Sequence, residues 1–582
     1  MKIPYGNYDK TPAVHILSDG TEKGTYEGKN EIKEIISKRI KQSQRKKNVI
    51  AVDCYPGVDT DGVYELLSSF DFQKVIKSED CAKDIKEING MIERNLTDDR
   101  VFGVMSCHKL IEFFETEKIR NVITEIGEIK DGNILVYGVG ASLLYEPDIL
   151  VYCDLARWEI QKRYRAGMPN WMCENYDEDV LRKYKRGFFV EWRVADRHKI
   201  SIFDKIDYFL DTTTENYKLM TGPVLREGLK QTAKKPFRVV PFFDPGVWGG
   251  QWMKEVCDLP REEKNYAWCF DCVPEENSLL LEYDGVTVEI PAIDLVLTNP
   301  VALLGDKVHA RFGAEFPIRF DFLDTMEGQN LSLQVHPLTE YIQNNFGMHY
   351  TQDESYYMLD AEDDACVYLG VKTGTTPDSL IPALTEAQET AEFDDALYVN
   401  KFPAKKHDHF LIPAGTMHCS GANSMVLEIS ATPYIFTFKL WDWNRLGLDG
   451  KPRPVHIEHG KNNIQYNRDT EWVKKNLINR EETLEERDGY KEERTGLHER
   501  EFIETRRYWF TKPFDLNTDG GVQVMNLVEG DEITITSKTG AFEPYTVHYA
   551  ETFIIPASVG DFTVSPGKNE TTYGLMRAYV RT

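Results

Sequence analysis

Four polar side chains, carried by three short segments of the chain, have the types and spacing of a metal site. The four are Gln334, His336, Glu354 and His418. Together they offer one amide oxygen, two imidazole nitrogens and one carboxylate, which is a complete set of ligands for an ion of the zinc class. The set contains no thiolate, and mixed nitrogen and oxygen ligands are typical of a site that exchanges water or a substrate oxygen.

The segments that carry these residues are predicted to be strands and a tight turn. Side chains two residues apart share a face of an extended strand, so Gln334 and His336 should point the same way. An apolar run follows Glu354, which we expect to open the next strand, and the Pro-Ala-Gly-Thr turn before His418 should direct that imidazole into a barrel. Taken singly, each residue has a plainer interpretation: a polar pair, an exposed carboxylate, or a buried histidine satisfied by its neighbours.

The composition is that of a globular protein with several domains. Of the 582 residues, 41% are hydrophobic and 28% are charged, and a chain of this length exceeds one ordinary core. Asp and Glu number 95 against 69 Lys and Arg, so the net charge is -26. Such a charge repels nucleic acid, and a phosphorylated substrate would need a locally basic site. A nucleic-acid partner is therefore not expected.

The sequence contains no signal for export or membrane insertion. Its first ten residues have no apolar stretch, and we find no apolar run of about 18 residues or more, the length that spans a membrane. The cysteines are dispersed, apart from Cys269 and Cys272 in a single CxxC. Dispersed thiols favour a reducing compartment, with a structural metal or a redox pair as the alternative for the CxxC. We expect a cytoplasmic protein without a membrane partner.

The region 1–235 alternates strand and helix patterns, which predicts an α/β domain with a mostly parallel sheet. An apolar strand at 48–53 leads through a loop at 54–62 into a helical pattern. The stretch at 148–157, Asp-Ile-Leu-Val-Tyr-Cys-Asp-Leu-Ala-Arg, resembles the late strand and following helix of P-loop kinases.

The nucleotide site of such a kinase is not preserved in this sequence. A Walker A loop carries a lysine that meets phosphates, and the loop at 54–62 has none. Asp53, Asp59 and Asp61 would instead repel phosphate. We therefore expect a degenerate kinase-like domain with a packing or regulatory role.

The remainder of the chain favours short strands separated by turn signals, such as the Asp-Gly dipeptide at 284–285 between two apolar runs. The predicted divisions are a metal-binding β domain at 236–470, a charged helical or loop insertion at 471–505 and a second β domain at 506–582.

Several sequence blocks follow one another in a single order from about residue 240 to the C-terminus. They are Pro-Gly-Val-Trp-Gly-Gly-Gln-Trp at 245–252, Phe-Pro-Ile-Arg-Phe-Asp-Phe-Leu-Asp at 316–324, Gln-Val-His-Pro at 334–337, Phe-Leu-Ile-Pro-Ala-Gly-Thr-Met-His at 410–418, Val-Leu-Glu-Ile at 426–429, Trp-Asp-Trp-Asn-Arg at 441–445, Gly-Lys-Pro-Arg-Pro-Val-His at 450–456 and Glu-Thr-Phe-Ile-Ile-Pro-Ala-Ser at 551–558. In this combination the chain resembles the type I mannose-6-phosphate isomerases. The resemblance implies a cupin-type double β-barrel or jelly roll with one Zn²⁺ per chain at the four ligands above. It also implies interconversion of mannose 6-phosphate and fructose 6-phosphate.

This reaction needs groups that move a proton and stabilise an enediolate oxygen. Arg445 matches an active-site arginine of the family and could bind the oxyanion or the phosphate. Glu428 is a candidate proton shuttle or partner of a ligand histidine, with His456 as a second candidate base. Lys439, with Lys451 and Arg453, offers the best local basic cluster for a phosphate monoester, and the alternative for each is an ordinary solvated cation.

One departure from the family concerns Gln352. Many type I isomerases have a lysine two residues before the glutamate ligand, and a neutral amide cannot replace its charge. A sugar-phosphate sensor with little turnover is therefore one alternative. A cupin oxygenase is another, because two histidines and a carboxylate also describe an Fe(II) site, although Gln334 as a fourth ligand argues against it. A bifunctional kinase and isomerase is disfavoured by the missing Walker lysine.

Overall fold

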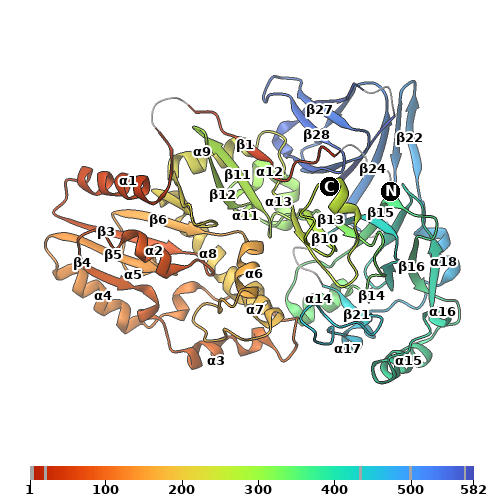
Figure 1. The fold of residues 1–582 in the computed structure, drawn as a ribbon, viewed down its shortest axis with the longest axis horizontal. Coiled ribbons are helices and arrows are strands. Elements are labelled where there is room, and N and C mark those ends of the chain that lie inside the picture. Colours follow the sequence, from red (N-terminus) through yellow and green to blue (C-terminus); the bar gives the residue numbers. More distant parts are fainter. Residues whose placement is uncertain (1–5, 19–22, 432–435, 497–500, 569–571) are drawn as a thin grey trace. The chain divides into compact units, whose positions relative to one another are not determined.

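The computed structural model describes residues 6–18, 23–431, 436–496, 501–568 and 572–582, and it divides into two compact units (Figure 1). Unit 1 consists of Met1–Pro12, Ala233–Asn277 and Asn299–Thr582, and unit 2 of Ala13–Thr232 and Ser278–Thr298. The chain therefore enters each unit more than once. The multidomain organisation expected from the length is confirmed.

Unit 2 is built on a seven-stranded sheet in the order β2-β8-β7-β6-β3-β5-β4. Its strands are β2 (Thr25–Glu27), β3 (Lys47–Cys54), β4 (Phe72–Lys77), β5 (Gly132–Gly138), β6 (Ile149–Asp154), β7 (Tyr208–Asp211) and β8 (Lys218–Thr221). The five strands from β4 to β7 in this order are parallel, whereas β8 and β2 are antiparallel. The predicted α/β class is confirmed, and the kinase-like assignment stays a prediction.

Helices connect these strands, as parallel neighbours require. The longer ones are α1 (Lys29–Gln42), α2 (Thr60–Leu67), α3 (Ile85–Leu96), α4 (Thr116–Glu128), α6 (Arg157–Arg165), α7 (Val180–Arg186), α8 (Trp192–Ile202) and α9 (Gly222–Thr232), and α5 (Ala141–Leu144) is a short turn of helix. The strands are buried on both faces, since β3 and β6 have almost no exposed residue. This burial explains why their sequences are continuous apolar runs.

A second, smaller sheet of unit 2 comes from a distant part of the chain. Strands β11 (Ser278–Tyr283) and β12 (Val286–Pro291) form a hairpin, β1 (Ala13–His15) pairs with β11 in parallel, and α11 (Ile293–Thr298) follows. The hairpin turn is the predicted Asp-Gly dipeptide, with φ of 51° at Asp284 and 78° at Gly285. Both residues at positive φ match the tight turn that the right-handed twist of a hairpin favours.

Buried charges attach this hairpin segment to the large sheet. The Lys199 ammonium on α8 lies 2.7 Å from Asp294 of α11 and 2.5 Å from Asp154 at the end of β6, and all three side chains are almost fully buried. The Trp158 indole donates to the Ser278 hydroxyl (2.8 Å), and the Glu289 amide donates to Asp211 (3.0 Å). The carboxyl ends of β6 and β7 are thus covered by residues 278–298.

Unit 1 contains two pairs of β-sheets. The first pair has the strand orders β18-β15-β20-β13-β10-β9 and β17-β16-β19-β14-β21. Its strands are β9 (Phe242–Asp244), β10 (Trp268–Cys272), β13 (Arg319–Asp324), β14 (Leu333–Val335), β15 (Glu354–Ala361), β16 (Cys366–Val371), β17 (Val399–Pro403), β18 (His409–Ile412), β19 (His418–Ser420), β20 (Ser424–Ser430) and β21 (Phe438–Trp441). Helices in the loops include α10 (Trp252–Val256), α12 (Pro300–Leu304), α13 (Asp306–Phe312), α14 (Thr339–Phe346), α15 (Pro377–Thr390), α16 (Asp395–Tyr398) and α17 (Ile457–Gly460).

The second pair of sheets lies toward the C-terminus, in the orders β22-β23-β24-β31-β26-β29 and β25-β30-β27-β28. Its strands are β22 (Glu482–Arg487), β23 (Tyr490–Arg494), β24 (Ile503–Phe510), β25 (Phe514–Asn517), β26 (Gln523–Glu529), β27 (Glu532–Ser537), β28 (Tyr545–His548), β29 (Thr552–Ile555), β30 (Asp561–Pro566) and β31 (Tyr573–Val580). Aromatic and branched side chains from both sheets share one core. Within 471–505, α18 (Thr470–Asn476) is followed by a hairpin whose β23 pairs with β24, so this charged stretch extends a sheet.

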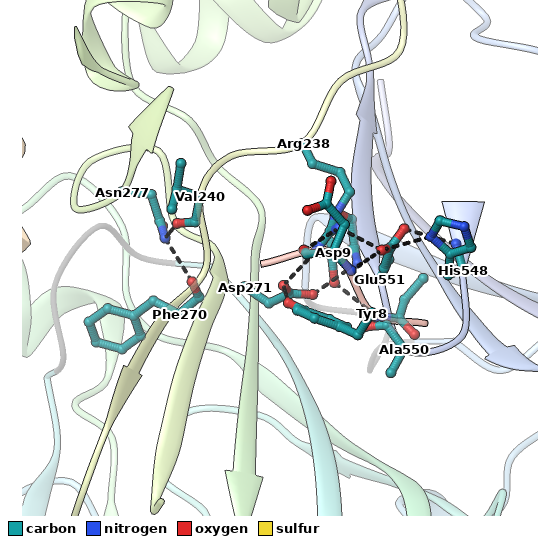
Figure 2. A network of polar contacts seen from close by, with 12 residues as sticks. Tyr8, Asp9, Arg238, Val240, Phe270, Asp271, Asn277, His548, Ala550 and Glu551 are labelled. Atoms are coloured by element: carbon teal, nitrogen blue, oxygen red, sulfur yellow. Dashed lines mark hydrogen bonds and ion pairs between the residues drawn. The ribbon is translucent and has the colours of Figure 1, made fainter. Parts of the chain in front are cut away.

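A polar network joins the N-terminal segment of unit 1 to both of its β regions (Figure 2). The Tyr8 hydroxyl donates to Asp271 on β10 (2.5 Å), and the Asp9 amide donates to Glu551 (2.7 Å). Arg238 forms an ion pair with Glu551 at 2.8 Å, and its guanidinium lies over the Tyr8 ring. Buried charges need partners of this kind, and Tyr8 is part of the unit 1 core through this network.

We expect Lys199→Met to destabilise unit 2 by about 3–5 kcal/mol, because it leaves two buried carboxylates without a counter-charge. Hydrogen–deuterium exchange of β6 and β11 measures the loss locally. Lys205→Met is the control, since the pair of Lys205 with Glu146 is exposed and should contribute under about 1 kcal/mol. Wild-type protection of β6 and β11 in Lys199→Met would show that the buried pair does not hold the hairpin segment.

Candidate metal centre

The structure brings the four candidate ligands together from both sheets of the first pair. Gln334 lies in β14 and His336 follows that strand directly, while Glu354 and His418 are the first residues of β15 and β19. Gln334 and His418 are opposite each other in the β14–β19 pair. The expectation that Glu354 opens a strand is correct, and the turn before His418 leads into β19 as expected.

The ligand atoms converge on one point. The Nε2 atoms of His336 and His418 lie 3.1 and 2.7 Å from different oxygens of Glu354. One ligand atom from each of these three residues lies within 4.8 Å of the others. The Gln334 amide nitrogen is 3.2 Å from His418 Nε2, and a half-turn of that amide would direct its oxygen there instead.

Backbone carbonyls orient both imidazoles. His336 Nδ1 is 2.7 Å from the Phe436 carbonyl, and His418 Nδ1 is 2.8 Å from the Thr416 carbonyl. A carbonyl only accepts, so each Nδ1 must carry the proton that it donates. In its neutral form, each ring presents the lone pair of Nε2 toward Glu354, as metal-binding histidines do when a second group holds their other nitrogen.

The burial of these groups tests whether a cation fits. The side chains of His336, Glu354 and His418 are all 0% exposed, and His336 Nε2 and Glu354 Oε1 have no hydrogen bond. Burial opposes ionisation of Glu354, but His336 and His418 hold the pKa of its carboxyl well below the ordinary value. An ionised carboxylate with two inward nitrogens and a nearby amide fits a divalent ion of the zinc class.

The three residues expected to act on substrate are placed differently from one another. Lys439 is opposite Gln334 in the β14–β21 pair, so it lies one strand from a ligand. Glu428 on β20 is opposite Tyr356 of β15, two residues beyond Glu354. Gln352 donates to Glu354 (2.9 Å) and to Glu428 (3.4 Å), so its neutral amide bridges two carboxylates.

Arg445 is held by its own neighbours. Its guanidinium donates to the Asn330 carbonyl (2.7 Å) and pairs with Asp442. Asp442 also binds Arg453 at 2.5 Å. Two of the predicted cations thus share one buried carboxylate, which the sequence reasoning did not include.

The sequence did not single out Arg319 and Asp321. The guanidinium and the carboxylate form a buried ion pair of 2.6 Å on β13, next to β20. A signal was present in the pattern Arg-Phe-Asp-Phe at 319–322, because charged residues that alternate with phenylalanines share one face of a strand.

In and beside the loop at 54–62, aspartate side chains bind other groups of unit 2. Asp53, at the end of β3, accepts from the Gly140 amide (2.9 Å), the Ser142 amide (3.0 Å) and His198 (2.9 Å). Asp59 caps α2 by accepting from the Gly62 amide (3.1 Å). Backbone N–H groups that could bind an anion are therefore satisfied internally, which agrees with the missing Walker lysine.

The fold and this geometry define a class: a β-sheet unit with a buried centre of mixed nitrogen and oxygen ligands, joined in one chain to an α/β unit. Residues 29–234 match the family model "Domain of unknown function (DUF8485)".

Comparison with known proteins adds relatives for the chain. Mannose-6-phosphate isomerase ManA of Bacillus subtilis is 26% identical over 227 residues, 38% of this chain and 66% of that protein. A mannose-6-phosphate isomerase of Streptococcus mutans is 27% identical over 214 residues, 36% of this chain and 62% of that protein. The matched stretches thus span about two thirds of these relatives, whereas the match to YvyI of Bacillus subtilis, at 22% identity, covers 57% of this chain and 96% of that protein. The crystal structure of the Bacillus subtilis mannose 6-phosphate isomerase aligns with 60% of this chain and 100% of its own at 18% identity, with a TM-score of 0.49.

Two further expectations concern membranes and the CxxC. Within the described residues, no helix is long and apolar enough to cross a bilayer. Cys269 and Cys272 are both buried, free thiols on β10. Burial raises the pKa of each thiol well above its ordinary value, so these residues are not poised as thiolates.

Replacing His418 with alanine should abolish tight binding of a divalent ion. The loss should exceed the about 10- to 100-fold that follows removal of an outer partner of a metal site. Equilibrium competition between the protein and a chromophoric chelator for Zn²⁺ gives the affinity directly. His349→Ala, at an exposed position, is the control, and equal affinities of the two variants would contradict the assignment.

Proposed function

We propose that this protein is a zinc-dependent aldose–ketose isomerase that interconverts mannose 6-phosphate and fructose 6-phosphate. The observation that carries the proposal is the buried convergence of His336, Glu354 and His418, with Gln334 beside them. Relatives at 22–27% identity, two of them named mannose-6-phosphate isomerase, support the choice of reaction.

The reaction moves a proton between C1 and C2 of the open-chain sugar. Its difficult step builds negative charge on the substrate oxygen as the proton leaves carbon. A bound Zn²⁺ supplies a Lewis acid that can polarise this oxygen. His336, Glu354, His418 and Gln334 would hold the ion, and their burial excludes bulk water from its surroundings.

The protein groups near the ligands suggest roles in proton transfer and binding. Glu428 is linked to Glu354 through the Gln352 amide, so it is the described carboxyl that we assign to moving the proton. Lys439 is the candidate for the phosphate group because it lies beside Gln334 in the sheet. Arg445 has a supporting role at Asp442, since that carboxylate and the Asn330 carbonyl engage its guanidinium.

A second candidate function follows from Gln352. Its amide is buried and donates to two carboxyl groups. Many type I isomerases have a lysine at this position. A protein that binds sugar phosphate and rarely converts it is the alternative that this substitution favours. Saturable binding of mannose 6-phosphate to Zn²⁺-loaded protein without formation of fructose 6-phosphate would support that alternative over the enzyme.

Glu428→Gln should lower the turnover number for mannose 6-phosphate by about 10²- to 10⁴-fold, the usual contribution of a general acid or base. With Zn²⁺ in excess, occupancy of the site should stay at the wild-type level, because Glu428 is not one of the ligands. A coupled assay for fructose 6-phosphate gives the rate and metal analysis gives the occupancy. The matched control is Glu482→Gln on the exposed strand β22, and unchanged turnover in Glu428→Gln would exclude this carboxyl as the proton carrier.

A further inference from the structure

Three strands of unit 1 place four charged residues on the sheet face that carries Glu354. Glu354 and Arg319 are both opposite Ser430 of β20, from β15 on one side and β13 on the other. Glu428 is likewise opposite both Tyr356 and Asp321. Because side chains alternate along a strand, these two rows lie on the same face. The face therefore holds the carboxylates of Glu354, Glu428 and Asp321 together with the guanidinium of Arg319.

These groups are buried, so removing the partner of one of their charges has a high cost in free energy. Arg319 is 5% exposed, Asp321 2% and Glu428 6%. The Nε and Nη2 atoms of Arg319 bind the same oxygen of Asp321 at 2.7 and 2.6 Å. The Phe270 ring lies 5.1 Å from the guanidinium and packs against it. The other carboxylate oxygen, Asp321 Oδ1, is buried without a hydrogen bond.

We infer that Arg319 and Asp321 are positioning residues of the metal centre, and that this charge-neutral pair sets how tightly the centre holds a divalent cation. Gln352 brings no charge to Glu354 and Glu428, so the positive charge on this face comes from Arg319. Asp321 cancels that charge before it can weaken the attraction of the centre for a cation. The inference rests on the proposed function, because it assigns a role at the same centre.

Removing the negative charge of Asp321 and removing the positive charge of Arg319 should change the affinity for Zn²⁺ in opposite directions. Strands are spaced about 4.8 Å apart, so two residues separated by one strand lie roughly 10 Å from each other. At that separation and an effective dielectric constant of about 20, adding or removing one unit charge changes the affinity for a divalent ion by at least about tenfold. Asp321→Asn removes the negative charge that balances Arg319 near the ligands and should weaken Zn²⁺ binding by that factor. Removing the guanidinium as well, in Asp321→Asn with Arg319→Met, should restore an affinity within about threefold of wild type.

The experiment is chelator competition for Zn²⁺ with the full-length protein at pH 8. Burial raises the pKa of Asp321 to about 6, so the carboxylate is ionised at that pH. Arg319→Lys, which keeps the charge, should bind Zn²⁺ like the wild type. Glu493→Gln breaks an ion pair of 2.8 Å with Arg507 that is similarly buried in unit 1, and it should leave the affinity unchanged.

Each outcome decides the inference. The inference is supported if Asp321→Asn binds Zn²⁺ weakly and Arg319→Met, added to it, restores the binding. Structural damage would instead make the double variant bind more weakly still, because the effects of two damaging substitutions accumulate. The inference is overturned if Asp321→Asn and the wild type bind Zn²⁺ with equal affinity, or if the double variant binds Zn²⁺ more weakly than Asp321→Asn. Failure of the wild-type protein to bind Zn²⁺ would instead count against the proposed function, so the two failures are distinguishable.

Discussion

The structure depends on a single constraint, the burial of two imidazoles and a carboxylate against one another. Such groups have a high cost of transfer out of water unless each is paired. The protein provides partners on their outer sides, namely the Phe436 and Thr416 carbonyls behind the two rings. On the inner side, the Nε2 lone pairs of the two imidazoles face the Glu354 carboxylate. A divalent cation stabilises this arrangement, whereas apolar neighbours would not.

The same rule for buried charges organises the parts of the chain that lie away from this centre. Lys199 joins residues 278–298 to the parallel sheet of unit 2, and Arg238 joins the N-terminal segment to unit 1. Asp53 fills a cluster of backbone N–H groups that could otherwise hold an anion. Because the chain enters each unit more than once, we do not expect the two units to be separable at one cut near residue 235.

The local features were largely predictable from sequence, and the long-range pairings were not. The strand beginning at Glu354, the Asp-Gly turn at 284–285 and the alternation of strands and helices before residue 235 follow from side-chain periodicity and turn chemistry. The membership of residues 278–298 in unit 2 rests on contacts such as Lys199 with Asp294, and spacing along the chain does not encode them. Residues 482–494 form a hairpin, although their charges favoured a helix or loop, because pairing with β24 outweighs local preference.

At the candidate site, the residue types and spacing predicted that His336, Glu354 and His418 come together, whereas they did not predict the partners of the surrounding charges. The engagement of Arg445 by Asp442 and the Arg319–Asp321 pair depend on which strands become neighbours. X-ray absorption spectroscopy of the zinc-loaded protein tests the central claim most directly. The account predicts a first shell of nitrogen and oxygen only, with the outer-shell scattering of two imidazoles. A shell that contains sulfur, or one without imidazole scattering, would contradict it.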